Sequence, residues 1–150
     1  MPSGWLPVPA YKQSYPGRCL PACVRMVLAY YGDKREEDDL ARLLQSRRFG
    51  TRASNIRRLE AIGYSVTYGQ TTLAQLKDHL ANNIPPIVFL QTGPLPYWEE
   101  NVNHAVVLVG MTVDQAYVLD PAFDSVQSIP LDAFQLAWSD FDYTFAVVTK

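Results

Sequence analysis

The chain has 150 residues, of which 48% are hydrophobic, and its formal net charge at pH 7 is −2. A chain of this size can form one hydrophobic core but not two, so we expect a single domain over residues 1–150. The nearly balanced charge gives no basic face for nucleic acid, which we therefore exclude as a partner. The sequence has no signal-peptide pattern and no apolar run near the ~20 residues of a membrane span, which predicts a cytoplasmic protein without a membrane segment.

Five arginines form a basic cluster at positions 47, 48, 52, 57 and 58. The acidic run at residues 36–39 lies just upstream and can offset their charge. The pattern therefore favours a solvated helical region over a specific anion-binding site.

The chain up to about residue 81 is predicted to be mainly helical, after an extended arm at 5–8 and a loop at 14–17. A buried helix begins at Cys19, because apolar residues recur at helical spacing as far as Tyr31. Pro21 suits the first turn of that helix, and Gly32 suits its C-terminal cap. The other elements expected here are helices at 36–44 and 55–62, a strand at 64–68, and a helix capped by Thr72, with Ser54 and Gly63 as the cap and stop of the helix at 55–62.

The character of the sequence changes at Pro86, from where short apolar runs predict strands. Continuous apolar runs of this length are typical of buried strands. A turn at 112–115 separates two of them, which would then form a hairpin. The expected elements are strands at 86–90, 104–111, 116–120, 125–129 and 143–149, and a helix at 131–138. Helices followed by an antiparallel sheet define an α+β fold.

Cys19 stands at the predicted start of the buried helix, directly after a glycine-containing loop. A helix N-terminus favours negative charge, and therefore the thiolate form that a nucleophilic cysteine needs. Cys23 lies one turn further on, where core packing explains it better. A disulfide within one helical turn has poor geometry, and a zinc site would need two more ligands. We therefore expect no disulfide, no metal and no cofactor.

His104 begins one strand of the predicted hairpin, and Asp120 ends the other. If the two residues lie directly opposite each other, their side chains share a face, with Cβ atoms about 5 Å apart. The carboxylate could then bind one imidazole nitrogen and leave the other for a thiol, as nucleophilic catalysis requires. A slip of one residue would spoil this geometry. The pattern predicts Cys19 as nucleophile, His104 as general base and Asp120 as orienting carboxylate.

Two other parts of the sequence can border such a site. Gln13 lies six residues before Cys19, where its side-chain amide could donate to an oxyanion together with the Cys19 backbone N–H. The loop at 93–103 leads directly into His104, so we expect Glu100 to border the cleft and Tyr97, Trp98 and Glu99 to border it and contact the substrate.

These segments resemble a known family. Gln13, CLPACVRMVLAYYG, NHAVVLVG and VLDPAF, in that order, are similar to the bacteriocin-processing cysteine peptidases. In that family the domain usually begins an ABC exporter and cleaves leader peptides after a double glycine. The resemblance implies a papain-like cysteine peptidase fold, with N-terminal helices packed on a C-terminal antiparallel sheet. It also implies a Cys-His-Asp triad of Cys19, His104 and Asp120, a Gln13 oxyanion hole, and a peptide or protein substrate.

The chain departs from the family at the residues beside the nucleophile. Many members place Asp before it and Gly after it, whereas this chain has Arg18 and Leu20. These changes bear on substrate preference more than on chemistry, because neither removes a catalytic group. The absence of an ATPase segment predicts a stand-alone relative. Two alternatives to peptide hydrolysis stay open: a papain-like acyltransferase or amidase, and a non-catalytic peptide-binding domain.

Overall fold

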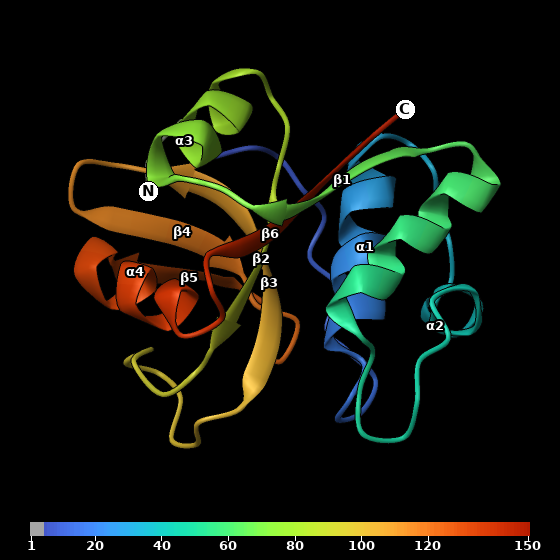
Figure 1. The fold of residues 1–150 in the computed structure, drawn as a ribbon, viewed down its shortest axis with the longest axis horizontal. Coiled ribbons are helices and arrows are strands. Elements are labelled where there is room, and N and C mark those ends of the chain that lie inside the picture. Colours follow the sequence, from blue (N-terminus) through green and yellow to red (C-terminus); the bar gives the residue numbers. More distant parts are fainter. Residues whose placement is uncertain (1–4) are drawn as a thin grey trace.

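Within residues 5–150, which the computed structural model describes, a six-stranded antiparallel sheet lies between two groups of helices (Figure 1). α1, α2 and η1 cover one face of the sheet, and α3 and α4 cover the other. The spatial order of the strands is β1-β6-β2-β3-β4-β5. The strands are β1 (Ser65–Gln70), β2 (Ile87–Gln91), β3 (Asn103–Met111), β4 (Gln115–Leu119), β5 (Val126–Pro130) and β6 (Thr144–Thr149). The helices are α1 (Cys19–Tyr30), α2 (Glu37–Leu43), the 3₁₀ helix η1 (Ala53–Ile62), α3 (Leu73–Ala81) and α4 (Leu131–Ser139).

The central strand β3 is buried on both faces. Ala105 and Val107 belong to the core beneath α1, whereas Val106 and Leu108 belong to the core beneath α4. Each buried Val or Leu side chain is worth about 1.5–3 kcal/mol. The two cores explain why the sequence of β3 is continuously apolar rather than alternating, and they hold the strand firmly in place.

Helix α1 has the bounds and the burial that its sequence predicts. Leu20, Val24 and Val27 are fully buried against the sheet side of the helix. Gly32 follows the C-cap residue with φ of 90°, the left-handed conformation that favours glycine. The helix is packed against β3, so its first residue, Cys19, is positioned by core packing behind it.

Three local predictions can be compared with the structure. Thr72 caps α3 as expected, since its side chain accepts a hydrogen bond from the Gln75 amide at 3.2 Å. The helix predicted at 55–62 is instead a 3₁₀ helix that begins at Ala53, and Ser54 lies inside it rather than at its cap. Its buried residues Ile56 and Leu59 are three apart, which matches the three-residue repeat of a 3₁₀ helix. The α+β class and the order of the elements are confirmed.

Candidate active site

A buried hydrogen bond joins His104, near the start of β3, to Asp120, which follows β4. The His104 Nε2 lies 2.6 Å from Asp120 Oδ1. Asp120 Oδ1 also accepts from the Ala122 amide at 3.0 Å, and Oδ2 accepts from the Tyr97 hydroxyl and the Trp98 Nε1, both at 2.9 Å. All these groups hold the carboxylate in one orientation. Because Nε2 is occupied, Nδ1 is the ring nitrogen left for another partner.

The predicted register of the β3–β4 hairpin is wrong by two residues. Leu119 pairs with Val107, and a bulge interrupts the ladder between Leu108 and Gly110. Continuing this pairing puts Val106, not His104, opposite Asp120. A shift of two residues keeps both side chains on the same face, because strand side chains alternate. His104 and Asp120 are therefore diagonal neighbours rather than direct opposites. The contact between them is made by the distal ring nitrogen Nε2, which reaches farther than Nδ1.

Cys19 is the first residue of α1 and is partly exposed in the same cleft as His104. Arg18 occupies the N-cap position of α1, but its side chain makes no capping hydrogen bond to the first-turn amides. These amides and the helix dipole favour an anion at Cys19. Cys23, by contrast, is fully buried, its thiol donates to the Ala105 carbonyl at 3.3 Å, and burial raises its pKa well above the usual value. The surroundings of Cys19 therefore favour the anionic form, whereas those of Cys23 favour the neutral thiol.

The ionisation states of His104 and Asp120 follow from their contacts. Burial by itself lowers the pKa of His104, but the hydrogen bond to Asp120 and the interaction with the Cys19 side chain outweigh burial and raise that pKa to about 9. Burial likewise opposes the charged form of Asp120, yet the contacts with His104 and Trp98 leave its pKa below the usual value. The ring is thus held as an imidazolium beside a carboxylate near neutral pH, which suits a partner that stabilises a thiolate and then donates a proton.

Gln13 lines the cleft with Cys19, and its backbone amide donates to the Pro121 carbonyl at 2.7 Å. Its side-chain Nε2 donates to the Tyr15 carbonyl at 3.1 Å. An amide nitrogen carries two hydrogens, so one N–H is still free to bind a substrate oxygen. The loop from Gln13 to Cys19 is therefore attached at one end to the segment that follows Asp120 and at the other to α1.

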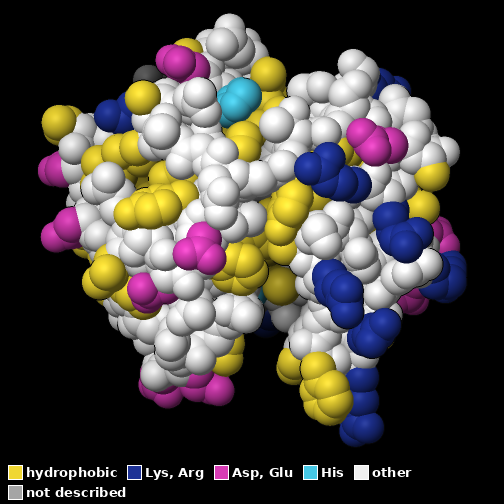
Figure 2. Space-filling model, in the orientation of Figure 1, with side chains coloured by type: hydrophobic (Ala, Val, Ile, Leu, Met, Phe, Trp, Pro, Cys, Tyr) yellow, Lys and Arg dark blue, Asp and Glu magenta, His cyan; other side chains and the backbone are white. Residues whose placement is uncertain are grey.

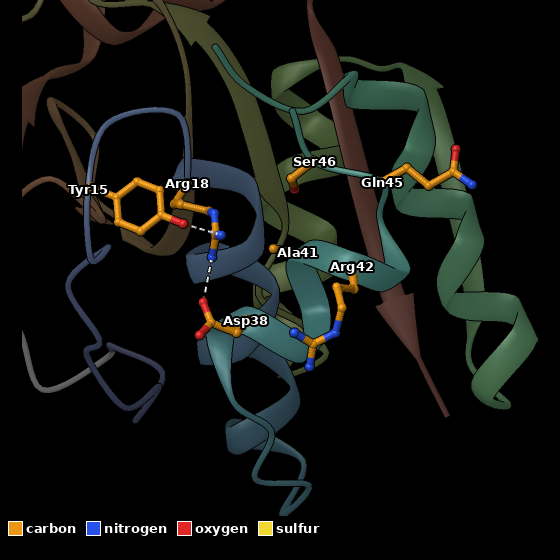
Figure 3. Close-up of a pocket in the computed structure, with 7 residues that line it drawn as sticks. All are labelled: Tyr15, Arg18, Asp38, Ala41, Arg42, Gln45 and Ser46. Carbon is orange, nitrogen blue, oxygen red and sulfur yellow. Dashed lines mark hydrogen bonds and ion pairs between the residues drawn. The ribbon is translucent and has the colours of Figure 1, made fainter. Parts of the chain in front are cut away.

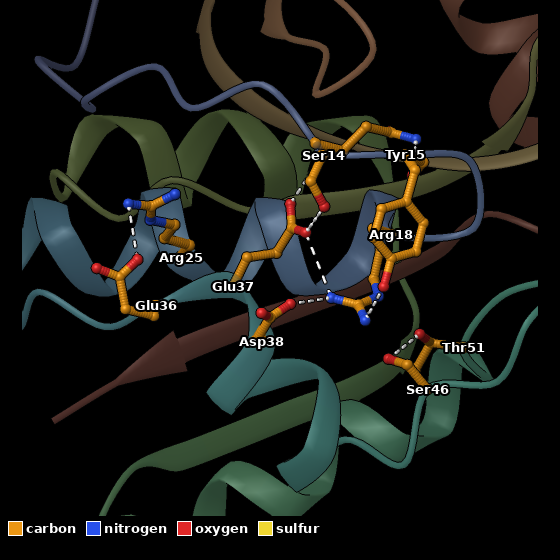
Figure 4. Close-up of polar contacts among 10 residues, drawn as sticks. Ser14, Tyr15, Arg18, Arg25, Glu36, Glu37, Asp38, Ser46 and Thr51 are labelled. Atoms are coloured by element: carbon orange, nitrogen blue, oxygen red, sulfur yellow. Dashed lines mark hydrogen bonds and ion pairs between the residues drawn. The ribbon is translucent and has the colours of Figure 1, made fainter.

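A buried carboxylate, Glu37 of α2, ties this loop to the helical layer (Figure 4). It accepts hydrogen bonds from the Ser14 amide, at 3.0 Å, and from the Ser14 hydroxyl. Arg18 contacts Glu37 at 3.4 Å and Asp38 at 2.9 Å. Figure 3 shows Arg18 held between Tyr15 and Asp38, at the edge of a polar pocket that lies outside the cleft. Arg18 therefore serves as an anchor for the loop.

Glu37 is a site-supporting residue that sequence analysis missed. The run of four acids in which it lies predicts exposed charges. A signal was nevertheless present, because Glu37 stands three residues before Leu40 and seven before Leu44, both fully buried. That spacing places it on the apolar face of α2.

The loop beside Cys19 also depends on Gly17. Its φ is 90°, and an added Cβ would lie 3.0 Å from the Arg48 carbonyl oxygen and 3.2 Å from the Gly50 nitrogen. Gly32 has the same φ but open space around it, which makes it a matched control. We expect Gly17→Ala to lower the free energy of unfolding by about 1 kcal/mol more than Gly32→Ala, measured by urea denaturation, because only the former adds a clash to the left-handed strain. It should also slow alkylation of Cys19. Equal losses in the two variants would contradict this role.

The cleft has a volume of about 780 Å³ and is lined by residues from the segments 13–19, 47–52 and 98–104 and by Ala122. Among the residues predicted to bind substrate, Trp98 lines the cleft, and its ring lies 4.9 Å from that of His104. Tyr97 is turned instead toward Asp120, and Glu99 is exposed outside the lining, where its neighbour Glu100 takes part. Substrate contact by these residues stays a prediction. The segment 47–52 was not predicted at this site.

Two further structural properties concern metal binding and membrane crossing. Among the described residues 5–150, no group of three His, Cys, Asp or Glu side chains is placed to hold a metal ion. Over the same range, no helix combines the length and the apolar character that crossing a membrane requires.

The α+β fold, with helices on both faces of an antiparallel sheet, is that of a C39 peptidase domain. Residues 5–145 match the model of the Peptidase_C39 like family, and the chain belongs to that family. No curated protein matches the chain.

Solved structures of the same fold include peptidases of this type. A C39-like peptidase from Bacillus anthracis has a TM-score of 0.80 at 16% identity, with 96% of this chain and 95% of that chain covered. A double glycine motif protease from an AMS/PCAT transporter, in complex with its leader peptide, has a TM-score of 0.76 at 23% identity, over 97% and 94%. The peptidase domain of Streptococcus ComA, a bifunctional ABC transporter of a quorum-sensing pathway, has a TM-score of 0.76 at 20% identity, over 95% and 98%. The predicted papain-like α+β fold and the family resemblance are thereby confirmed.

Proposed function

We propose that this protein hydrolyses peptide bonds with Cys19 as nucleophile, His104 as acid and base, and Asp120 as the orienting carboxylate. The observation that carries this proposal is the 2.6 Å contact of His104 Nε2 with a buried Asp120, beside a cysteine that begins a helix in the same cleft. Covalent catalysis by a thiol requires a nucleophile, a base next to it, and a third group that orients the base.

The first half of the reaction forms an acyl-enzyme. The Cys19 thiolate attacks the carbonyl carbon, a C–S bond forms, and the electron pair of the C=O double bond moves to oxygen. The Cys19 backbone N–H and the free Gln13 Nε2 N–H donate to that oxyanion. As the C–N bond breaks, His104 gives the proton on Nδ1 to the leaving amine.

The second half releases the acid. Neutral His104 takes a proton from water, whose oxygen attacks the thioester carbonyl. The C–S bond then breaks, which regenerates the thiolate and the imidazolium. Asp120 stays ionised throughout and keeps Nε2 as a donor, so that proton transfer occurs only at Nδ1.

The proposed substrate is a peptide or protein segment. One structural neighbour is a double glycine motif protease with its leader peptide bound, so cleavage after a Gly-Gly pair is the specificity to test first. Neither Arg18 nor Leu20 lines the cleft, because Arg18 pairs with Asp38 of α2 and Leu20 is buried in the core.

Alkylation by iodoacetamide near neutral pH, with labelled sites mapped by mass spectrometry, tests the proposal. We expect rapid labelling of Cys19, slow labelling of the fully buried Cys23, and slower labelling of Cys19 in His104→Ala. His79→Ala is the matched control, since His79 lies on α3. Equal, slow labelling of both cysteines would refute the thiolate role. A peptide panel then identifies the acceptor: products that carry an added amine in place of water would assign acyl transfer instead.

A further inference from the structure

The arginines of the segment 47–58 are not neutralised by the acidic run that precedes them. Asp38 pairs with Arg18, Glu36 with Arg25 and Asp39 with Arg42. Among the described residues, no ion pair involves any arginine between residues 47 and 58, and all five of these side chains are exposed. The upstream acids thus pair with arginines outside the segment 47–58, whose own five arginines are exposed, as a solvated region predicts.

Two of these arginines belong to the candidate active site. Arg47 and Arg52 line the cleft that holds Cys19 and His104. They also line, with Arg58, an adjoining groove of about 220 Å³. The cleft and the groove share Arg47, Gly50 and Arg52, so a chain bound at Cys19 can continue into the groove without leaving the surface.

The charge of the molecule is distributed unevenly around the cleft. Figure 2 shows Lys and Arg side chains gathered over the half that contains η1 and the loop before it, beside the hollow between the two halves. The segment 98–104 contributes to the same cleft a carboxylate, Glu100. A bound peptide therefore meets positive charge on the side of residues 47–58 and a negative charge on the side of β3.

We propose that the groove formed by Arg47, Arg52 and Arg58 is a specificity subsite for acidic side chains of the peptide substrate. This inference rests on the proposed peptidase function and adds the substrate class. Guanidinium groups bind carboxylates through paired N–H donors, and three such groups without acidic partners suit a segment with more than one Asp or Glu. Phe49, which is 92% exposed and also lines the cleft, offers an apolar contact beside them.

A peptide fits these observations better than a nucleic acid. The groove is small, it adjoins the candidate catalytic residues, and the protein as a whole carries a net charge of −2. Polynucleotide binding needs a longer basic track that follows many phosphates. The chemistry therefore points to a few carboxylates within reach of the scissile bond.

Binding can be measured without turnover in the full chain carrying Cys19→Ala. The probes are three fluorescein-labelled ten-residue peptides with a central Gly-Gly: one with three Glu before it, one with three Glu after it, and one with Gln in all those places. By fluorescence anisotropy, we expect one of the acidic peptides to bind about tenfold more tightly than the Gln peptide at low salt. Added salt should reduce that difference.

Substitution of the arginines identifies the subsite. Arg47→Gln, Arg52→Gln and Arg58→Gln together should abolish the preference for the acidic peptide. Arg48→Gln with Arg57→Gln is the control, because neither residue lines the cleft or the groove. Equal binding of acidic and Gln peptides, or equal loss in the control, would overturn the inference. So would tighter binding of a single-stranded oligonucleotide that depends on the same arginines.

The failure of this inference can be distinguished from the failure of the proposed function. If the acidic and Gln peptides bind equally well while Cys19 is alkylated rapidly, the subsite is rejected and the proposed peptidase function stands. Charge-selective binding alongside unreactive Cys19 would reject catalysis and leave an acidic-peptide-binding groove.

Discussion

A Cys19→Ala variant is expected to lose at least about 10⁴-fold in the rate of peptide hydrolysis while keeping its stability. Without the thiol no acyl-enzyme can form, and the oxyanion donors and binding groups that remain provide only residual catalysis. The stability should change little, because Cys19 is partly exposed and packs only at the margin of the core. Product formation measured by mass spectrometry and unfolding in urea give the two readouts.

Cys23→Ala is the matched control for that experiment. Cys23 is fully buried one turn along the same helix, so its truncation should lower the free energy of unfolding by about 1–2 kcal/mol and leave the hydrolysis rate within a fewfold of the parent. Undiminished hydrolysis by Cys19→Ala would place the nucleophile elsewhere. Loss of activity in both variants in proportion to stability would show that folding, not chemistry, was affected.

Truncation of Asp120 should be the most destabilising change at the site. Asp120 is 1% exposed and accepts hydrogen bonds from four donors. Asp120→Ala leaves all four without a partner and His104 without a counter-charge, so we expect a loss of about 3–5 kcal/mol in the free energy of unfolding. Hydrolysis should fall at least about 10²-fold, because the imidazole is no longer held in one tautomer and orientation.

A double-mutant cycle separates orientation from a general loss of stability. Asp120→Asn preserves shape but places an NH₂ group where Oδ2 accepts from Trp98 Nε1, a donor that cannot become an acceptor. Trp98→Phe removes that donor. We expect the double variant to be more stable than the sum of the single losses predicts, by about 1 kcal/mol. Strict additivity would show that the Trp98–Asp120 contact contributes nothing.

The pH dependence of stability provides an independent readout of the same pair. The pKa of Asp120 is lowered in the folded protein, so its contribution is present above its unfolded value near 3.8 and is lost as pH falls. The pKa of His104 is raised to about 9, so its contribution is fully present below 6.5 and is lost as pH rises through 9. The difference in unfolding free energy between the parent and Asp120→Ala should therefore be largest between about pH 4 and 6.5. A difference independent of pH would contradict the ion pair.

Much of the architecture follows from local patterns. The helical spacing of apolar residues after Cys19, with Pro21 in the first turn and Gly32 after the last, determines where α1 begins and ends. The continuous apolar run of β3 determines that the strand is buried on both faces. These signals are readable because propensity, capping and burial act over a few neighbouring residues.

Other features arise only when distant segments meet. The hairpin register depends on a bulge between Leu108 and Gly110, and nothing in the local pattern specifies it. The 3₁₀ form of η1 likewise depends on how Ile56 and Leu59 pack into the core. The hydrogen bond from Tyr97 to Asp120 also joins two segments far apart in the chain, and no local pattern indicates it.

The charged and catalytic side chains also show which features depend on the sequence alone and which depend on the tertiary structure. The sequence by itself determined that a cysteine begins a buried helix, and that a histidine and an aspartate lie at the ends of two neighbouring strands. Only the tertiary structure decided that Asp38 pairs with Arg18 and Glu36 with Arg25, and which arginines of the described residues lie beside the cleft without an ion pair. The physical reason is that an ion pair forms between side chains close in space, and in a folded chain the nearest partner in space is often far away in sequence.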